Sequence, residues 1–252
     1  MPKHYVISDI HGMYNIYEQV CAMLQPNDVV YFLGDAADRG YACFKTMKAI
    51  YNNPQWIYIK GNHEDMMVSA LRQNTGEDVE AYYSPMGMWF GNGGESTFNE
   101  WLEDGADLAW IVRLDKLPLQ AEYTNEKGIT FHMSHAGFTL GEFPWGDDLL
   151  WSRDHFYAKW DEENYPNDIC IHGHTPMEYL LRKLSYMEKF TGVTRKTYDP
   201  TKPQAKSYCN GHKINIDNGV FYTGYTVLYD LDEMVAIPLK DEEFNKEECI
   251  YG

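Results

Sequence analysis

The sequence has few of the features that would place a protein in a membrane or hold it together with disulfide bonds. It contains no run of about 18 consecutive apolar residues, so we expect no membrane-spanning helix and no membrane partner. Residues 1–8 lack a charged segment followed by a long apolar stretch, so we expect no signal peptide. The cysteines are widely spaced and form no CxxC pair, which argues against a zinc ribbon or a disulfide framework. We therefore expect a cytoplasmic protein with free thiols.

Positive charge is also scarce. The 252 residues include 21 lysines and arginines against 38 acidic residues, for a formal net charge of −17. A chain this acidic repels nucleic acid at long range, so we expect no nucleic-acid partner. It would also repel a phosphorylated substrate unless positive charge gathers locally. The length suits one compact domain spanning residues 1–252.

Apolar segments alternate with amphipathic ones in the first third of the chain, and strands return after about residue 119. This alternation predicts βαβ units and a parallel sheet whose faces are covered. The expected strands are 5–7, 28–33, 56–59, 120–123, 129–133, 169–171 and 214–216, with one or two more in 222–239. The expected helices are 14–24, 41–50 and 64–72, with a further helical region at about 77–118. The acidic tail at about 241–252 is expected to be mobile or solvated.

Side chains that can bind metal ions follow five of the predicted strands: Asp9, His11, Asp35, Asn62, His135 and His174. In α/β sheets ligands bind at the carboxyl ends of strands, so we expect these residues to share one site. Residues i and i+2 of a strand point to one side, so Asp9 and His11 can hold one ion. Asp35 can bridge two ions, because a carboxylate has several acceptor positions. The neutral side chains of Asn62, His135 and His174 can complete the coordination of the second ion.

Oxygen and nitrogen ligands without thiolate favour Mn²⁺, Fe or Zn²⁺ over soft metals. Two such ions roughly 3.5–4 Å apart polarise a phosphoryl group and generate hydroxide near neutral pH. The sequence therefore predicts two divalent metal ions as cofactors, with Mn²⁺ the first choice and Fe or Zn²⁺ the alternatives.

The same motifs occur in a fixed order, D-x-H-G, G-D-x-x-D-R-G, G-N-H-E, H-A-G and G-H-T-P. This set resembles the phosphoprotein phosphatase family of the calcineurin-like metallophosphoesterase superfamily, especially its small phage and bacterial serine/threonine phosphatases. Trp151-Ser152-Arg153 resembles the W-x-R segment of that family, and Ile216-Asp217-Asn218-Gly219 resembles its I-D-T-G element. The resemblance spans residues 4 to about 230. It implies an α/β fold in which a β-sandwich is flanked by helices in four αββα layers, with the active site at strand C-terminal ends.

The resemblance also implies a role for each matched residue. His63 would be the general acid that protonates the leaving oxygen, and Asp38 would orient it. Arg39 and Arg153 would clamp the phosphate, for which a planar guanidinium fork is suited. The metal ligands would be Asp9 and His11 on the first ion, Asp35 between the ions, and Asn62, His135 and His174 on the second. The implied reaction is direct in-line attack on a phosphate ester by a metal-bridging hydroxide.

The leading interpretation is a metal-dependent serine/threonine protein phosphatase that acts on a phosphorylated protein, a peptide or a small phosphate ester. The alternative is a hydrolase of dinucleoside polyphosphates such as diadenosine tetraphosphate. Asp38 and Glu64 argue against that branch, which tends to show A-R-G and G-N-H-D. A phosphodiesterase is disfavoured because the second histidine of a G-H-x-H ending is absent. A binding module without catalysis would require a lost ligand or general acid, and none is missing.

Several residues near the motifs have two interpretations. Asp217 either hydrogen-bonds a ligand residue or forms a turn. His132 and His172 are expected to be structural, and Trp89, Trp101 and Trp110 are expected to build core rather than stack bases. Glu64 is expected to act as a first-turn acid on a helix dipole.

A basic segment at about 177–211 begins directly after the last metal-binding motif. It carries seven basic and three acidic residues, a net of +4 in a chain of −17. It is either a lid that recruits anionic substrate or a solvated surface insertion.

Overall fold

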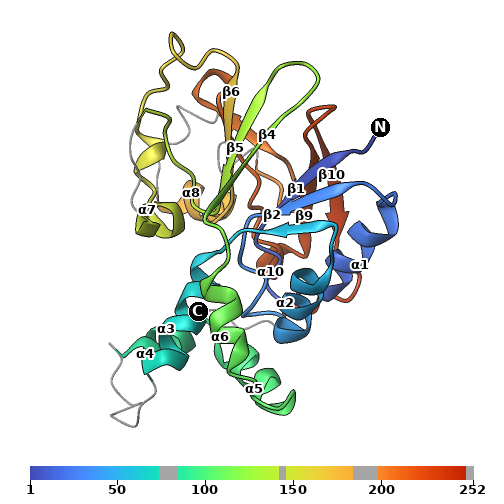
Figure 1. Ribbon diagram of the computed structural model, residues 1–252, viewed down its shortest axis with the longest axis vertical. Coiled ribbons are helices and arrows are strands. Elements are labelled where there is room, and N and C mark those ends of the chain that lie inside the picture. Colours follow the sequence, from blue (N-terminus) through green and yellow to red (C-terminus); the bar gives the residue numbers. More distant parts are fainter. Residues whose placement is uncertain (74–83, 142–145, 184–197, 248–252) are drawn as a thin grey trace.

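The computed structural model describes residues 1–73, 84–141, 146–183 and 198–247, and in these ranges two five-stranded sheets lie face to face (Figure 1). The first sheet has the order β10-β9-β1-β2-β3, with β1 His4–Ile7, β2 Val29–Phe32, β3 Trp56–Tyr58, β9 Tyr225–Asp230 and β10 Val235–Lys240. The second has the order β4-β5-β6-β8-β7, with β4 Gln120–Thr124, β5 Thr130–Ser134, β6 Asp168–His172, β7 Lys206–Tyr208 and β8 Lys213–Asn215.

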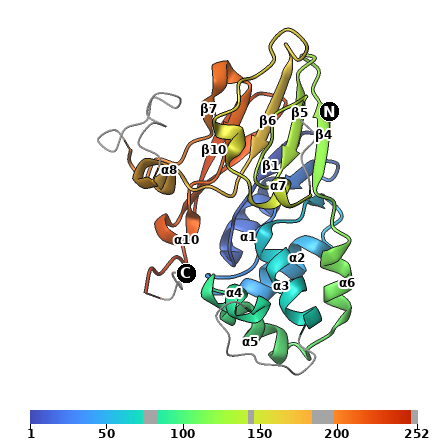
Figure 2. The same ribbon diagram turned by 90° about the vertical axis from the view of Figure 1, so that its left-hand side faces the viewer.

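Helices cover the outer face of the first sheet, and shorter helical segments lie against the second. The helices on the first side are α1 Tyr14–Met23, α2 Cys43–Asn52, α3 Asn62–Gln73, α4 Pro85–Gly91, α5 Glu95–Glu103, α6 Ala109–Asp115 and α10 Val220–Thr223. Those on the other side are α7 Gly146–Trp151, η1 Asp154–Phe156, α8 Met177–Lys183 and η3 Cys209–Gly211. Figure 2 shows α3 to α6 gathered beneath the two sheets. The expected layered α/β sandwich is confirmed.

The alternation of side chains along each strand explains why the central strands are apolar throughout. Tyr5 and Ile7 of β1 face the helices, whereas Val6 faces the second sheet. Strand β2 repeats this pattern, with Phe32 in the helix-facing core and Tyr31 in the core between the sheets. Side chains on both faces are therefore buried, and each fully buried apolar side chain contributes about 1.5–3 kcal/mol.

The parallel strands expected for the first third of the chain are present, but neither sheet is parallel throughout. Each has three parallel strands, β1-β2-β3 and β5-β6-β8, but antiparallel strands complete it. Strands β9 and β10 form a hairpin antiparallel to β1, and β4 and β7 are antiparallel edges of the second sheet. The helix-rich first third contains the βαβ units that the pattern predicts, whereas the later strands are joined partly by hairpins. Strand β7 and helix α10 were not predicted.

The first part of the acidic tail packs against the body, contrary to the expectation of a solvated segment. Asp241 is 2 % exposed and accepts a hydrogen bond from the Tyr41 hydroxyl at 3.0 Å. Phe244 packs on the core beneath the first sheet. Residues 248–252 lie outside the described ranges.

No helix of the described ranges is long and apolar enough to cross a membrane. Four cysteines, Cys21, Cys43, Cys170 and Cys209, have free thiols, as expected.

Candidate functional site

The predicted metal-binding side chains meet at the carboxyl ends of the parallel strands. They follow β1, β2, β3, β5 and β6, and the two sheets bring these strand ends to one place. The site joins positions 165 residues apart, because the backbone N–H of His174 donates to the Asp9 carboxylate at 3.0–3.1 Å. The six predicted ligands are all 8 % exposed or less: Asp9, His11, Asp35, Asn62, His135 and His174.

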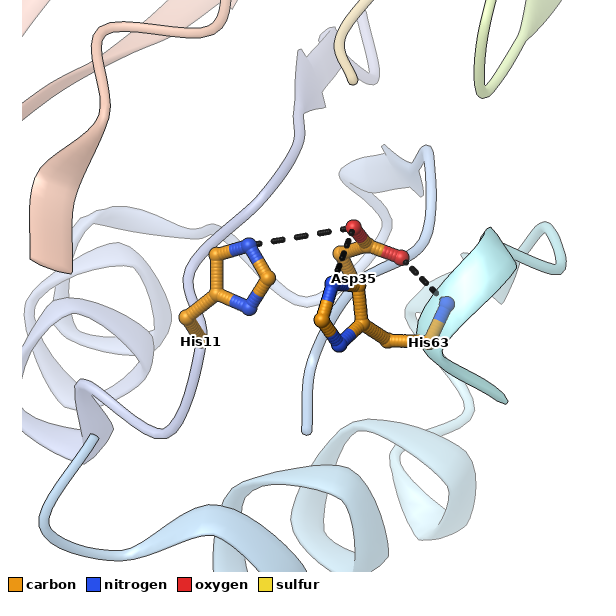
Figure 3. A group of neighbouring side chains, drawn as sticks. All are labelled: His11, Asp35 and His63. Carbon is orange, nitrogen blue, oxygen red and sulfur yellow. Dashed lines mark hydrogen bonds and ion pairs between the residues drawn. The ribbon is translucent and has the colours of Figure 1, made fainter. Parts of the chain in front are cut away.

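The Asp35 carboxylate is the centre of this cluster. Its Oδ2 lies 3.7 Å from His11 Nε2, 3.8 Å from His63 Nε2 and 3.5 Å from His135 Nε2. Figure 3 shows one oxygen of this carboxylate facing a ring nitrogen of His11 and a ring nitrogen of His63. Its Oδ1 accepts the backbone N–H of His63 at 3.0 Å, which fixes the orientation of the group. Two sets of ligand-type atoms share Asp35, one with His11 and His63 and one with Asp9 and His135.

Backbone carbonyls set the tautomers of two of these histidines. His11 Nδ1 lies 2.9 Å from the carbonyl of Ala37, and His135 Nδ1 lies 2.7 Å from that of Leu33. A carbonyl only accepts, so each Nδ1 carries the hydrogen. The Nε2 lone pair of each ring therefore points into the site, as it would in a metal ligand.

The same reasoning tests whether a cation fits. His135 Nε2 lies 2.8 Å from Asn62 Oδ1, and His174 Nδ1 lies 2.9 Å from the same oxygen. With its hydrogen on Nδ1, neutral His135 presents only a lone pair to the Asn62 oxygen. Two acceptors at this distance are unfavourable unless a cation lies beside them or the Asn62 amide turns to donate through its nitrogen. The residues thus fit a divalent metal ion.

Burial makes the case for cations stronger. Burial and the charge of the neighbouring Asp217 raise the pKa of Asp9 to about 7. Burial and the Asp9 charge raise the pKa of Asp35 well above its usual value. Burial, followed by the charge of Arg39, lowers the pKa of His11 and His63 well below the usual range. The imidazoles are therefore neutral at pH 7, and the buried carboxylates require a neighbouring positive charge to ionise.

The backbone of the site is in an unusual conformation. A positive φ is uncommon for residues other than glycine. Residues with this conformation cluster at functional sites, where the surrounding structure holds them in place. Six of the motif residues have it: Asp9 (51°), His11 (41°), Asp35 (60°), Asp38 (71°), Arg39 (72°) and His174 (66°). The surrounding structure therefore holds these turns in place at a cost to stability.

His63 and Asp38 form a buried pair. His63 Nδ1 lies 2.6 Å from Asp38 Oδ2, and His63 Nε2 faces Asp35. Asp38 is held in turn by the indole N–H of Trp89 at 2.9 Å and by the hydroxyl of Thr97. Burial raises the pKa of Asp38 to about 7, although the donors Thr97 and Trp89 oppose the shift. The expected contact between His63 and Asp38 is present.

Trp89 and Thr97 are site residues that the sequence did not reveal as such. Trp89 is fully buried, as expected for core, but its N–H also serves Asp38 from 51 positions away. Thr97 lies in the first turns of α5, 59 positions from Asp38. No local pattern marks either contact. Trp101 and Trp110 are buried too, so none of the three indoles is available to stack a base.

Glu64 joins two of the ligand-bearing loops. Its buried carboxylate accepts the backbone N–H groups of Asp35 at 2.9 Å, Ala36 at 2.9 Å and Gly61 at 2.8 Å, and the hydroxyl of Tyr58 at 2.8 Å. It lies in the first turn of α3, as expected, but its main role is to hold the loop after β2 against the loop after β3. A Cβ at Gly61 would lie 2.2 Å from Asp35 Oδ1, so only glycine allows this approach.

The two arginines flank the cluster. Arg39 Nη1 lies 3.1 Å from His11 Nε2, its Nε donates to the carbonyl of Asn92 at 3.3 Å, and its guanidinium lies 4.4 Å from the centre of the Phe221 ring. Arg153 lies 5.0 Å from the centre of the Tyr179 ring. Both arginines line the same cavity as five of the six predicted metal ligands, Asp9, His11, Asp35, Asn62 and His174.

That cavity has a volume of about 530 Å³. Besides the ligands and arginines, its walls include Trp151, Tyr179, Phe221, Tyr222, Glu178, Asp217 and Lys246. A charged floor of this kind with a partly aromatic rim can hold a phosphate group together with a neighbouring organic group. The two arginines predicted to bind phosphate and most of the predicted metal ligands thus line one open cavity.

The structure shows the surroundings of Asp217, His172 and His132, for which the sequence allowed two interpretations. Asp217 forms a turn, because its Oδ1 accepts the N–H of Gly219 at 2.8 Å, and it also faces the cavity near Asp9. His172 bonds the Tyr208 hydroxyl at 2.8 Å and is structural. His132 lies between Glu122 (2.9 Å) and Asp168 (2.7 Å), away from the cavity.

The basic segment can be followed only in part. Helix α8 and strand β7 belong to it, but residues 184–197 lie outside the described ranges. Its role as a lid therefore stays a prediction.

Comparison with known proteins agrees with this geometry. The family model described as calcineurin-like phosphoesterase matches residues 3–212. The chain is 25% identical over 186 residues to serine/threonine-protein phosphatase 2 of Salmonella typhimurium, covering 69% of this chain and 80% of that protein. It is 34% identical over 66 residues to a symmetrical bis(5'-nucleosyl)-tetraphosphatase of Wigglesworthia glossinidia brevipalpis, covering 25% of this chain and 24% of that protein. A metallophosphoesterase structure from Sphaerobacter thermophilus superposes with a TM-score of 0.55 at 14% identity, covering 95% of this chain and 87% of that one, which supports the fold alone.

Proposed function

The chain belongs to the family of calcineurin-like phosphoesterases, and on that basis we propose that it is a two-metal phosphomonoesterase that acts as a serine/threonine protein phosphatase. The family uses a dinuclear metal centre, and the chain is a phosphoester hydrolase. The observation that carries the proposal is the position of Asp35 Oδ2, 3.5–3.8 Å from imidazole nitrogens of His11, His63 and His135. A single carboxylate at that point can bridge two cations.

We assign Asp9 and His11 to one metal ion, Asp35 to both, and Asn62, His135 and His174 to the other. Bound divalent cations supply Lewis acidity and an activated water for attack on phosphorus. The lone pairs of His11 and His135, directed inward by the carbonyls of Ala37 and Leu33, support this assignment. Oxygen and nitrogen donors without thiolate favour Mn²⁺, with Fe or Zn²⁺ as alternatives.

In this proposal the proton for the leaving oxygen comes from Nε2 of neutral His63, and protonated Asp38, whose pKa burial raises to about 7, supplies the hydrogen that His63 Nδ1 accepts. Asp38 holds the ring through Nδ1 at 2.6 Å, so Nε2 is the atom that faces the cavity. Trp89 and Thr97 fix Asp38 from behind, which limits rotation of the pair. A positioned acid of this kind is worth about 10²–10⁴ in rate.

Arg39 and Arg153 bind the phosphate oxygens. Each guanidinium lies near an aromatic ring, Phe221 or Tyr179, which restricts its orientation before substrate arrives. Their positive charge, with that of the cations, counteracts the repulsion expected from a chain of net charge −17.

The protein-phosphatase assignment is supported by the relative from Salmonella typhimurium, which is matched over 80% of its length. The second candidate is a dinucleoside polyphosphate hydrolase. It is favoured by the 34% identity with the bis(5'-nucleosyl)-tetraphosphatase, although over 66 residues only, and by the aromatic side chains at the rim of the cavity. Tyr179 and Tyr222 are the rim residues on which a base could stack.

The test is a turnover assay of metal-stripped protein with and without added Mn²⁺. The substrates are a phosphoserine peptide and diadenosine tetraphosphate, and His63→Asn is assayed in parallel. We expect Mn²⁺-dependent release of phosphate from the peptide, with a loss of at least 10² in the variant. Preference for the dinucleotide would move the substrate class to the second candidate. Absence of turnover on both would overturn the proposal.

A further inference from the structure

A completely buried lysine lies outside the cavity wall and has no part in the proposed reaction. Lys213 is the first residue of β8. Side chains alternate along a strand, so Lys213 and its neighbour Ile214 point to opposite faces of the second sheet. Ile214 belongs to the core between the sheets, which places Lys213 on the outer face with η1. An ammonium group at such a position needs polar partners, because the loss of its water is unfavourable.

The Lys213 ammonium contacts two loops at once. It donates to the carbonyls of His155 at 2.5 Å and Ala158 at 3.1 Å, and to the hydroxyl of Thr139 at 2.9 Å. His155 and Ala158 lie in and just after η1, whereas Thr139 lies in the loop after β5. An ammonium group has three N–H donors and can serve several oxygens together. The side chain therefore joins β8 to two loops that carry residues of the site.

The first of these loops presents Arg153 to the cavity. Arg153 directly precedes η1, and its carbonyl accepts the N–H of Phe156 at 3.2 Å, so it belongs to the same short helical turn. The carbonyls at the end of a helical turn have no donor within it, and a cation placed there is favourable. Lys213 occupies this position, because the carbonyls of His155 and Ala158 lie at the C-terminal end of the turn.

The position of the Arg153 guanidinium depends on the turn that carries it. Among the residues that the structure describes, its buried Nε has no hydrogen-bond partner. The guanidinium lies 5.0 Å from the centre of the Tyr179 ring, and such a contact constrains direction less than a hydrogen bond does. A movement of the η1 turn would therefore move the guanidinium relative to a bound phosphate.

The metal ligand in the second loop is fixed by other contacts. His135 Nδ1 donates at 2.7 Å to the carbonyl of Leu33, which follows β2 of the first sheet. The N–H of Ala136 donates to the carbonyl of Leu149 at 2.8 Å. Neither bond involves Lys213. Loss of the ammonium should therefore disturb the binding of phosphate and leave the metal ions in place.

We propose that Lys213 is a positioning residue that fixes the η1 turn so that Arg153 meets the phosphate. This inference rests on the proposed function, in which Arg153 binds the phosphate oxygens. Lys213 does not line the cavity, and it acts through the carbonyls of His155 and Ala158. The group that Arg153 binds is a phosphate whatever molecule carries it, so inorganic phosphate is a sufficient probe.

A double-mutant cycle on phosphate binding tests the proposal. Isothermal titration calorimetry gives the Kd of inorganic phosphate for Mn²⁺-loaded protein with Lys213→Met, Arg153→Ala or both changes. Methionine is a long unbranched side chain without a donor. We expect Lys213→Met to weaken phosphate about tenfold when Arg153 is present and less than about twofold when it is absent. Metal analysis should show an unchanged metal content in each variant.

The matched control is Ile214→Ala, on the same strand. Ile214 packs in the core between the sheets, so alanine there destabilises the protein from the face opposite to η1. Thermal unfolding compares the stability of the variants, and the control should keep the Kd of phosphate within about twofold of wild type. If Lys213→Met does not fold, Thr139→Val replaces it. This variant removes one bond of the ammonium and should weaken phosphate about two- to threefold, again only while Arg153 is present.

An unchanged Kd, an equal weakening with and without Arg153, or the same loss in Ile214→Ala would overturn the proposal. Loss of metal in Lys213→Met would also overturn it, because the ammonium would then support His135. If Arg153→Ala binds phosphate as tightly as wild type, the assignment of Arg153 and this inference fail together. If wild-type protein hydrolyses no phosphopeptide but the cycle shows the dependence on both residues, the proposed substrate fails and the role of Lys213 stands.

Discussion

His63 Nδ1 lies 2.6 Å from Asp38 Oδ2, and both side chains are almost completely inaccessible to solvent. The carboxylate is held from two other helices, by Trp89 of α4 and Thr97 of α5. Helices α4 and α5 thus contribute to the site without contributing a predicted ligand. They fix the ring that we propose to be the proton donor.

Asp38→Asn should lower kcat by about 10² with a much smaller change in KM, because the amide can hydrogen-bond the His63 ring but cannot pass it a proton. Trp89→Phe removes one of the donors to Asp38 and should cost less, since Thr97 remains. Steady-state kinetics on an aryl phosphate give both values. Equal losses in the two variants would indicate a packing defect rather than a role in proton transfer.

His63→Asn distinguishes a proton donor from a metal ligand, because His63 Nε2 belongs to one of the ligand-type clusters around Asp35. We expect the variant to retain both metal ions while losing turnover. Metal analysis after gel filtration measures this directly, with His135→Asn as the comparison that should lose metal. A variant that binds one ion fewer would reassign His63 as a ligand.

The pH dependence of stability should differ between wild type and Asp38→Asn when both are metal-free. Burial raises the folded pKa of Asp38 to about 7, whereas an unfolded aspartate titrates near about 3.9. Its stabilising contribution is therefore complete below about pH 4 and is lost as the pH rises to about 7. Asparagine does not titrate, so the variant should gain stability relative to wild type across this window, on the order of 4 kcal/mol in total.

Urea denaturation of both proteins at several pH values measures that difference. The difference between the two proteins is needed because burial also lowers the pKa of His11 and His174. These histidines make both proteins more stable as the pH rises, which opposes the effect of Asp38, and they cancel in the difference. A constant difference from pH 4 to 7 would show that Asp38 is ionised throughout.

Glu64→Gln should destabilise the protein by on the order of 3 kcal/mol and weaken metal binding. One carboxylate oxygen accepts the N–H groups of Asp35 and Gly61, and an amide nitrogen placed there would leave both donors unsatisfied. Thermal unfolding with and without Mn²⁺ measures both effects. Glu95→Gln, in the exposed first turn of α5, is the control and should change stability by less than about 0.5 kcal/mol.

The basic segment at 177–211 and a cytoplasmic location stay predictions. The described part of the segment places Tyr179 and Glu178 of α8 at the cavity, but three of its seven basic residues, Lys189, Arg195 and Lys196, lie outside the described ranges.

The sequence by itself determined which residues gather at the site. Short turns after apolar strands carry Asp9, Asp35 and His174, and a parallel strand always presents its end at the same edge, so a local pattern was enough. The strands were also predictable from local pattern. Successive side chains of β1 and β2 point into two different cores, so both strands are apolar throughout.

Only the tertiary structure decided how those residues are supported. The mixed sheets depend on hairpins that a strand pattern does not specify. Trp89 reaches Asp38 across 51 positions, and Lys246 enters the cavity only because Asp241 and Phe244 dock near α10. Such contacts are set by how distant segments pack, and no periodicity or spacing along the chain encodes them.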